Sequence, residues 1–332
     1  MGTERHIGVN LGGWLILEKW LTPSVFKGLQ AGDEWELSQT PEGRKRIEQH
    51  RKTFITEADF VWLRDHGVTL LRLPVPYWAI VESEEYVFAG YEVGWTMQMA
   101  EKYGLKVLLD LHAAPGGQNV GDHSGRKGQC EWFEDTECQE QTLEILLQMA
   151  ETYKDSPALW GVEILNEPEA KGHVRQLIRF YRRAYKELRS VVRPGTYTVF
   201  HDGFQPLLFT GSLWPRRDYP VIMDVHWYGF PIDQAKTMES YMRLSRWLRL
   251  GMARFLQLWQ PIMVGEWSSV LPQRFFDAAP QDSHMTLLHQ NIRMQQRVHA
   301  LTPADMYWNY KAEGEGMWHF RSLVEKGILP LD

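Results

Sequence analysis

Eight short apolar runs, separated by segments with helical periodicity, are the feature of this sequence that most limits its possible folds. Apolar runs bounded by turn-forming residues are typical of strands buried on both faces of a parallel sheet. Strands that alternate with helices in this way predict an α/β fold, a single (β/α)8 TIM barrel over residues 1–332. The length suits one such barrel with insertions. The expected strands are 6–11, 69–75, 106–113, 159–168, 196–202, 221–227, 261–267 and 306–310.

The helical segments between these runs carry start and stop signals. Thr56 and Asp59 form a variant of the capping box at the start of one helix, and Gly104 stands where a C-cap glycine ends another. Residues 26–46 contain three glycines and a proline, and are therefore expected to form a long loop with at most a short helix. The expected helices are 56–66, 88–103, 137–153, 171–192, 237–258, 283–300 and 320–326.

Composition excludes several classes of protein. The formal net charge of −6 leaves no basic footprint of the kind that nucleic acid or an anionic membrane attracts. No run of about 18 apolar residues exists, so no membrane span is expected. Cys130 and Cys138 are too few for a disulfide framework or a four-ligand zinc site. They can form a local disulfide, but two unrelated thiols are the favoured interpretation.

The first residues lead directly into an apolar strand, without a basic segment followed by an apolar one. No signal peptide is therefore visible. A cytoplasmic location is expected, or export with a leader that this sequence does not contain. Oligomeric state stays open.

Polar side chains gather where the expected strands end. Asn166 and Glu167 close the run 159–168, and Glu266 lies at the end of the run 261–267. In a barrel the carboxyl ends of all strands surround one mouth, so the two glutamates are expected to face each other across it. Taken alone, Glu167 is as easily a surface turn residue; the shared placement favours a cleft. The other candidates at the strand ends or in the strands are Glu18, Arg72, His112, His226, Tyr228 and Trp308.

Two carboxylates across a cleft suit cleavage of a glycosidic bond. One protonates the leaving oxygen while the other attacks the anomeric carbon, and a gap of roughly 5 Å predicts retention whereas a wider gap predicts inversion. Arg72 is placed to keep one carboxylate ionised. His226 and Tyr228 can bond the nucleophile or a sugar hydroxyl. Trp308, one of 15 tryptophans, can stack on the apolar side of a sugar ring.

Each candidate also has an ordinary structural interpretation. A histidine or tryptophan on a strand is more often a core residue, and Glu18 in a loop is more often solvated. Glu163 shares its strand face with Glu167 and is expected to pair with a buried donor. The sequence has no His-x-His strand motif, zinc-protease motif, serine-hydrolase motif or phosphate-binding loop. No metal and no cofactor are therefore expected.

Seven motifs, in order along the chain, together resemble the motifs of a known family. They are GVNLGGWLILEKWLTPSVF (8–26), LRLPVPYW (71–78), LDLHAAPGGQN (109–119), ILNEP (164–168), DVHWYGF (224–230), VGEWS (264–268) and YWNYKAE (307–313). They resemble family 5 glycoside hydrolases of the cellulase superfamily, most closely the exo-β-1,3-glucanase branch.

The resemblance implies a retaining mechanism on a catalytic barrel, with Glu167 as acid/base and Glu266 as nucleophile. It also implies that Glu18 grips the terminal glucose and that Asn119 is a further sugar ligand. Asn166 would bond the 2-hydroxyl of the cleaved sugar. The residues matching the family's sugar subsite are Arg72, His112, Asn166, His226, Tyr228 and Trp308.

The implied substrate is a β-glucan or β-glucoside, most simply a β-1,3-glucan that loses glucose from its non-reducing end. The regions 129–138 and 202–220, which shape the acceptor side, do not match that branch. Two alternatives therefore stay open. One is a β-glucosidase acting on another glucoside or a glucolipid, and the other is a non-catalytic carbohydrate-binding barrel.

Overall fold

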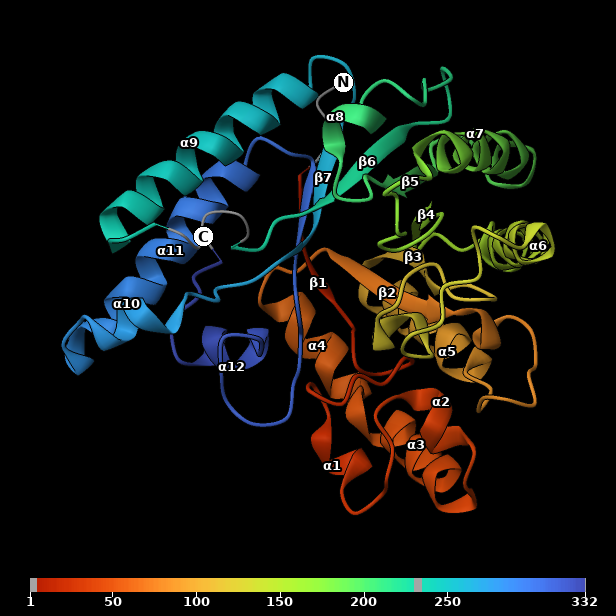
Figure 1. Cartoon of the computed structure of the whole chain (residues 1–332), viewed down its shortest axis with the longest axis horizontal. Helices are drawn as coiled ribbons and strands as arrows, with labels where there is room; N and C mark the ends of the chain where they lie inside the picture. Colours follow the sequence, from red (N-terminus) through yellow and green to blue (C-terminus); the bar gives the residue numbers. More distant parts are fainter. Residues whose placement is uncertain (1–4, 230–234, 332) are drawn as a thin grey trace.

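The computed structural model describes residues 5–229 and 235–331, and its centre is a closed barrel of eight parallel strands in sequence order (Figure 1). The predicted (β/α)8 architecture is therefore confirmed. Phe230, the last residue of the DVHWYGF motif, lies outside the described residues. The strands are β1 His6–Asn10, β2 Leu70–Pro76, β3 Lys106–Ala113, β4 Leu159–Glu163, β5 Tyr197–His201, β6 Val221–His226, β7 Ile262–Trp267 and β8 Ala304–Tyr307.

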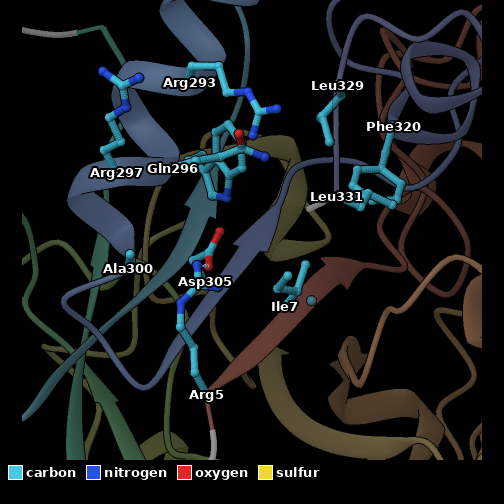
Figure 2. A pocket seen from close by; sticks show the side chains of 12 residues that line it. Arg5, Ile7, Arg293, Gln296, Arg297, Ala300, Asp305, Phe320, Leu329 and Leu331 are labelled. Atoms are coloured by element: carbon cyan, nitrogen blue, oxygen red, sulfur yellow. Dashed lines mark hydrogen bonds and ion pairs between the residues drawn. The ribbon is translucent and has the colours of Figure 1, made fainter.

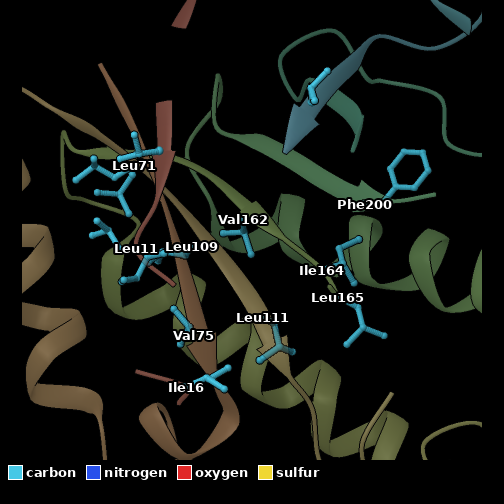
Figure 3. Close-up of a cluster of buried hydrophobic side chains, with 14 of the residues drawn as sticks. Leu11, Ile16, Leu71, Val75, Leu109, Leu111, Val162, Ile164, Leu165 and Phe200 are labelled. Atoms are coloured by element: carbon cyan, nitrogen blue, oxygen red, sulfur yellow. The ribbon is translucent and has the colours of Figure 1, made fainter. Parts of the chain in front are cut away.

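Alternation along each strand produces two apolar layers. In β2, Leu71, Leu73 and Val75 point outward and pack beneath the surrounding helices, as the cluster in Figure 3 shows for Leu71 and Val75. Leu70, on the opposite face, belongs to a smaller cluster with Leu108 and Met306. The same inner face carries Arg72, so the barrel interior is apolar below and polar toward the mouth.

The helices lie around the barrel (Figure 1). α4 begins with the expected capping box, in which Thr56 and Asp59 each bond the other's backbone N–H, and Gly104 ends α5 at φ 72°. The helices are α1 Pro23–Phe26, α2 Glu34–Ser38, α3 Pro41–Phe54, α4 Glu57–Asp65, α5 Gly90–Tyr103, α6 Thr136–Tyr153, α7 Val174–Val191, α8 Pro206–Phe209, α9 Met238–Leu256, α10 Gln273–Asp277, α11 His284–His299 and α12 Phe320–Glu325.

The short helix allowed within residues 26–46 is present as α2, but the prediction of a loop was wrong from Pro41 onward, where α3 begins. Pro41 does not interrupt a helix but occupies its first turn, where a missing N–H costs nothing, and Thr40 caps it by accepting a hydrogen bond from Gly43 N. Tertiary contacts then hold the segment in place. Arg51 of α3 forms a buried ion pair with Glu34 of α2, at 2.6 Å.

Two strands end or begin away from their predicted limits. β4 stops at Glu163, so Asn166 and Glu167 belong to the following loop rather than to the strand. β8 begins at Ala304 and ends at Tyr307. The polar residue Asp305 hid the start of β8, but its carboxylate is paired with Arg5 at 2.5 Å, so the strand can contain it.

The structure bears on the expectations for the two cysteines and for a membrane-spanning helix. Cys130 and Cys138 are both free thiols. Within residues 5–229 and 235–331, no helix combines the length and the apolar character needed to cross a membrane.

Candidate active site

The guanidinium of Arg72 lies buried inside the barrel and organises the polar groups beneath the mouth. It donates hydrogen bonds to Glu163 Oε2 at 2.8 Å and to Glu266 Oε1 at 3.0 Å. A third bond, at 2.8 Å, goes to Asn166 Oδ1. A buried cation is tolerated only with such partners. The expectation that Glu163 serves a buried donor is confirmed, and the same cation orients Glu266.

Glu167, in the loop after β4, and Glu266, in β7, meet at one histidine. His226 Nδ1 lies 2.5 Å from Glu167 Oε1 and 3.4 Å from Glu266 Oε2. Because both oxygens contact one nitrogen, they cannot be farther apart than these two distances together, about 5.9 Å. Tyr228 donates a further hydrogen bond to Glu266 Oε2 at 2.6 Å. The structure therefore brings the two glutamates together at the mouth.

The surroundings of the two carboxylates drive their pKa values apart. Burial raises the pKa of Glu266 to about 7; the charge of Glu167 adds to this effect, and those of His226 and Arg72 offset part of it. Burial also acts on Glu167, but the hydrogen bond and charge of His226 outweigh it and lower the pKa of Glu167 below its ordinary value. Burial disfavours a charged His226, yet Glu266 and Asp224 raise its pKa well above the usual one. In the free protein at neutral pH, His226 therefore holds the proton nearest to Glu167.

The backbone that presents Glu167 is held in an unusual conformation. Glu167 has φ 41°, in the left-handed region that a residue with a side chain rarely adopts. Neighbouring amides fix the loop: Asn119 Nδ2 donates to Glu167 O at 3.0 Å, and Gln118 Nε2 donates to Asn166 O at 3.0 Å. Such conformations cost about 1–3 kcal/mol and persist where the surroundings impose them. This loop aims the carboxylate into the mouth.

A cavity of about 190 Å³ lies between these groups. Cavities for drug-sized ligands hold roughly 300–1,000 Å³, so this one suits a single sugar residue. Trp308 forms one wall and stacks parallel to His112 with ring centroids 5.8 Å apart. Gly12 makes room for Trp308, since a Cβ there would lie 2.6 Å from the indole. The lining residues are Glu18, Trp20, His112, His123, Asn166, Glu167, Tyr228, Glu266, Trp308 and Trp318.

Three of these lining residues, Trp20, His123 and Trp318, were not among the sequence candidates. Trp20 and Trp318 meet edge to face with centroids 5.1 Å apart, and they come from the loops after β1 and β8. His123 Nε2 lies 3.4 Å from Glu167 Oε2. The position of His123 in a glycine-rich loop after a strand could have identified it as a site residue. Nothing local in the sequence predicts that the two tryptophans meet.

Glu18 is buried rather than solvated. Trp20 Nε1 donates a hydrogen bond to Glu18 Oε2 at 2.9 Å, at the edge of the cavity that Trp318 also lines. Burial, together with the charge of Asp122, raises the pKa of Glu18 well above its ordinary value. Burial thus favours the protonated carboxyl group, which can donate a hydrogen bond as well as accept one.

Three sequence candidates for the sugar site do not line this cavity. Arg72 and His226 lie deeper, and Asn119 lies to one side. Its amide is used by the backbone of Glu167 and by Gly121 N, at 3.0 and 2.8 Å. It lines instead an adjoining cavity of about 610 Å³ that shares Glu167 with the first and is bordered by Phe204. The sequence could not separate these two cavities, because both are formed by loops.

Another cavity, of about 410 Å³, lies outside the barrel, between strands β1 and β8 on one side and α11 and the C-terminal segment on the other (Figure 2). It is lined by Arg5 and Ile7 near the start of β1 and by Asp305 near the start of β8, and Figure 2 shows Arg5 beside Asp305. In a (β/α)8 barrel the amino-terminal ends of the strands serve stability, whereas chemistry occurs at the carboxyl ends. Its position therefore separates this cavity from the paired glutamates.

Three groups of carboxylates and imidazoles among the described residues have possible ligand atoms within 4.8 Å of one another. His226 belongs to two of them, but its nitrogens already face Glu167 and Asp224, and its raised pKa favours protons on both. A protonated ring is no metal ligand. That no metal is needed stays a prediction. The groups are Glu167–His201–His226, Glu18–Asp122–His123 and Glu163–Asp224–His226.

Comparison with known proteins adds to this geometry. A family model described as cellulase (glycosyl hydrolase family 5) matches residues 35–313 of the chain. The chain belongs to glycosyl hydrolase family 5. It is a glycoside hydrolase that acts on carbohydrate, and the predicted resemblance is confirmed.

Curated relatives of this family 5 member cover nearly its whole length. It is 30% identical to a probable glucan 1,3-beta-glucosidase A of Aspergillus fumigatus, over 97% of this chain and 86% of that protein. It is also 30% identical to glucan 1,3-beta-glucosidase 1 of Schizosaccharomyces pombe, over 99% and 88%. A crystal structure of rutinosidase from Aspergillus niger has the same fold, with TM-score 0.80 and 21% identity over 98% of each chain.

Proposed function

We propose that this protein is a retaining exo-β-1,3-glucanase in which Glu266 is the nucleophile and Glu167 the acid/base. The observation that carries the proposal is the contact of both carboxylates with His226 Nδ1, which keeps their oxygens within about 5.9 Å. Inverting enzymes need roughly 6.5–9.5 Å to admit a water between the two groups, whereas retaining enzymes need about 5–5.5 Å. The geometry supports a double displacement.

In the first displacement, Glu266 attacks the anomeric carbon of the sugar in the small cavity. It is ionised above about pH 7. Arg72 and Tyr228 each bond one of its oxygens, at 3.0 and 2.6 Å, which orients the carboxylate for attack. Asn166, held by Arg72, faces the same cavity and is placed to bond a sugar hydroxyl.

The leaving oxygen needs a proton from Glu167, and the resting site keeps that proton on His226. The separation of 2.5 Å between Nδ1 and Glu167 Oε1 allows the proton to pass along the hydrogen bond. When the anomeric carbon bonds to Glu266, this carboxylate loses the negative charge that stabilises the His226 cation. Glu167, ionised after the first step, then activates the water of the second.

Release of single glucose units is supported by the closed end of the small cavity. Trp20 and Trp318 pack together beside Glu18, and these three residues border the small cavity but not the larger one. The larger cavity on the other side of Glu167 has room for the departing chain. The β-1,3 linkage is supported by the names of the curated relatives, which are glucan 1,3-beta-glucosidases.

The product profile tests this function. Digestion of laminarin-type β-1,3-oligosaccharides is expected to release glucose alone from the earliest times, measured by chromatography of product size. A ladder of intermediate lengths would contradict the exo mode. Parallel digestions of β-1,4- and β-1,6-glucans should be slower. Faster turnover of a glucolipid or another non-glucan glucoside would favour the second candidate, a β-glucosidase with a different leaving group.

That second candidate has one observation in its favour. The acceptor cavity is bordered by Val120 and Phe204, whose side chains are 55% and 58% exposed, and apolar surface of this kind accepts a non-sugar leaving group as readily as a second glucose.

The closed end of the cavity can be probed at Glu18. Glu18→Ala is expected to raise KM for β-1,3-oligosaccharides about tenfold, because a buried hydrogen-bonding group to the sugar is lost. Initial rates against substrate concentration measure this. Glu18→Gln is the matched control: the raised pKa shows that the site favours an uncharged side chain, so KM should change only a few-fold. Equal losses in both variants would contradict a neutral Glu18.

Tyr228 is expected to control the acid limb of the pH–rate profile. Its hydrogen bond favours the ionised form of Glu266, so Tyr228→Phe should raise the pKa of Glu266 above about 7. The acid limb of kcat/KM should then move to higher pH by about one unit. Tyr91→Phe, at an exposed tyrosine on α5, is the control and should leave the profile in place. A limb that moves to lower pH would contradict this assignment.

A further inference from the structure

The outward face of α9 differs from that of the other long helices around the barrel. Four large apolar side chains of α9 are exposed, and Trp247 is 70% exposed. Two more follow directly after the helix, Leu258 at 76% and Trp259 at 57%. Among the described residues of α5, α6, α7 and α11, only Tyr91 and Met285 are exposed large apolar side chains. The four on α9 are Leu244, Trp247, Leu248 and Phe255.

These side chains form one continuous stripe. Leu244, Trp247 and Leu248 are spaced by three and four residues, and Phe255 follows seven residues after Leu248, so all lie on the same side of the helix. A neighbouring side of α9, which includes Ser245, Ala253 and Leu256, is the one buried against the barrel. The exposed apolar stripe is therefore separate from the residues of α9 that pack against the barrel.

Positive charge accompanies the stripe. Arg243, Arg246 and Arg254 are exposed on α9, and Arg297 is exposed on α11. The sequence contains no aspartate or glutamate between Glu239 and Glu266. The chain as a whole carries a net charge of −6, so this face has the opposite sign to the rest of the molecule.

Helices α9 and α11 lie side by side on one flank of the barrel (Figure 1), and a groove of about 1010 Å³ runs between them. Apolar side chains and arginines line it together. Met242 and Trp247 line it from α9, and Leu287 and Met294 line it from α11. We call the apolar stripe, its three arginines and this groove the α9 face.

We propose that the α9 face binds the surface of an anionic lipid bilayer. Tryptophan, phenylalanine and leucine side chains enter the boundary between headgroups and acyl chains, while neighbouring arginines pair with anionic headgroups. Both features are needed for such binding, and both occur here on one helix, whose one carboxylate, Glu239, stands in the first turn and lines the groove. The molecule would lie on the bilayer and not cross it, with α9 along the surface.

Charge complementarity argues against a second copy of the chain as the occupant. Two α9 faces that met about a two-fold axis would set three arginines of each copy against three of the other, with Glu239 as the one carboxylate of each α9 to compensate them. An acidic protein would satisfy the arginines but has no special use for two exposed tryptophans and three leucines. The bilayer satisfies both sets of side chains.

Vesicle co-sedimentation tests the proposal with the full chain. Wild-type protein should pellet with vesicles of equimolar phosphatidylcholine and phosphatidylglycerol at low salt, and it should not pellet with phosphatidylcholine alone. Removing three charges by Arg243→Gln, Arg246→Gln and Arg254→Gln should weaken partitioning about 100-fold. Trp247→Ser, Leu258→Ser and Trp259→Ser should weaken it by about tenfold or more at unchanged charge.

The matched control removes three exposed charges from α7, another long helix around the barrel, which exposes no large apolar side chain: Arg175→Gln, Arg179→Gln and Lys186→Gln. This variant should partition like the wild type. All variants should keep full activity on a soluble aryl β-glucoside, which shows that they are folded.

Four results would overturn the proposal. The first is failure of the wild type to pellet with anionic vesicles, and the second is an equal loss of binding in the α7 control. The third is binding that is unchanged by the apolar substitutions but competed by soluble polyglutamate, which would assign the face to an acidic protein. The fourth is self-association of the wild type in analytical ultracentrifugation that the apolar variant abolishes, which would assign it to a second copy.

Discussion

Replacement of Glu266 by glutamine is expected to lower kcat/KM for an aryl β-glucoside by on the order of 10⁵-fold. The amide cannot attack the anomeric carbon, so the covalent intermediate does not form. Glutamine has nearly the same shape, and its carbonyl can still accept a hydrogen bond from Arg72. The loss should therefore appear in activity measured at saturating substrate, with a thermal unfolding midpoint close to that of the wild type.

Glu101→Gln supplies the control for this experiment, because Glu101 is an exposed glutamate of α5 far from the mouth. The activity of this variant should equal that of the wild type. The stereochemistry of the wild-type reaction provides an independent check. Nuclear magnetic resonance of the first product should show the β-anomer. An α-anomer would mean inversion and would remove Glu266 from the role of nucleophile, whatever the activity of Glu266→Gln.

Substitution of Glu167 by alanine is expected to separate the two halves of the reaction. Hydrolysis of an unactivated β-glucoside should fall by about 10³–10⁴-fold, since the leaving oxygen has no proton donor. An aryl glucoside with a good leaving group needs little protonation, so it should still form the covalent intermediate on Glu266. Added azide, which needs no general base, should then restore turnover and yield a β-glucosyl azide, identified by mass spectrometry and nuclear magnetic resonance.

The azide result distinguishes the two glutamates. Rescue in Glu167→Ala with a β-configured product supports one displacement by Glu266 followed by a second by azide. Rescue to an α-glucosyl azide would instead make Glu167 the nucleophile and reverse the two roles. Absence of rescue, in a variant that retains the wild-type unfolding midpoint, would contradict an acid/base role for Glu167.

The resting protonation of the site explains why both experiments are needed. The structure lowers the pKa of Glu167 and raises that of Glu266 to about 7, which by themselves would suggest the opposite assignment of acid and nucleophile. His226 accounts for this pattern. Its raised pKa keeps a proton on the ring, and Nδ1 lies 2.5 Å from Glu167 Oε1, so the acid is available to the leaving group although Glu167 is ionised at rest.

The positions of most site residues were predictable from the sequence because a barrel places the ends of all its strands around one mouth. Apolar runs that end in Asn166–Glu167 and in Glu266 therefore located both carboxylates without any knowledge of distances. Arg72, an arginine in an apolar strand, predicted a buried partner, and the structure provides Glu163 and Glu266. Each of these inferences used only residues within one strand.

Inferences failed where a contact joins distant parts of the chain. Residues 26–46 looked like a loop, but α2 and α3 are held by the Arg51–Glu34 pair and by capping at Thr40. Trp20 and Trp318 are almost the full chain length apart in sequence, and only barrel closure puts their rings together. The arginine-rich α9 face was hidden because net charge sums over the whole molecule and does not register segregation.

The sequence by itself determined the order of strands and helices, the strand ends that carry Glu167 and Glu266, and the reaction class those residues suit. This was possible because strand periodicity and turn residues act locally. Only the tertiary structure decided the gap between the two carboxylates, the shared proton on His226 and the closed end formed by Trp20 and Trp318. Such properties depend on distances of a few ångströms between residues far apart in sequence, and those distances exist only once the barrel has closed.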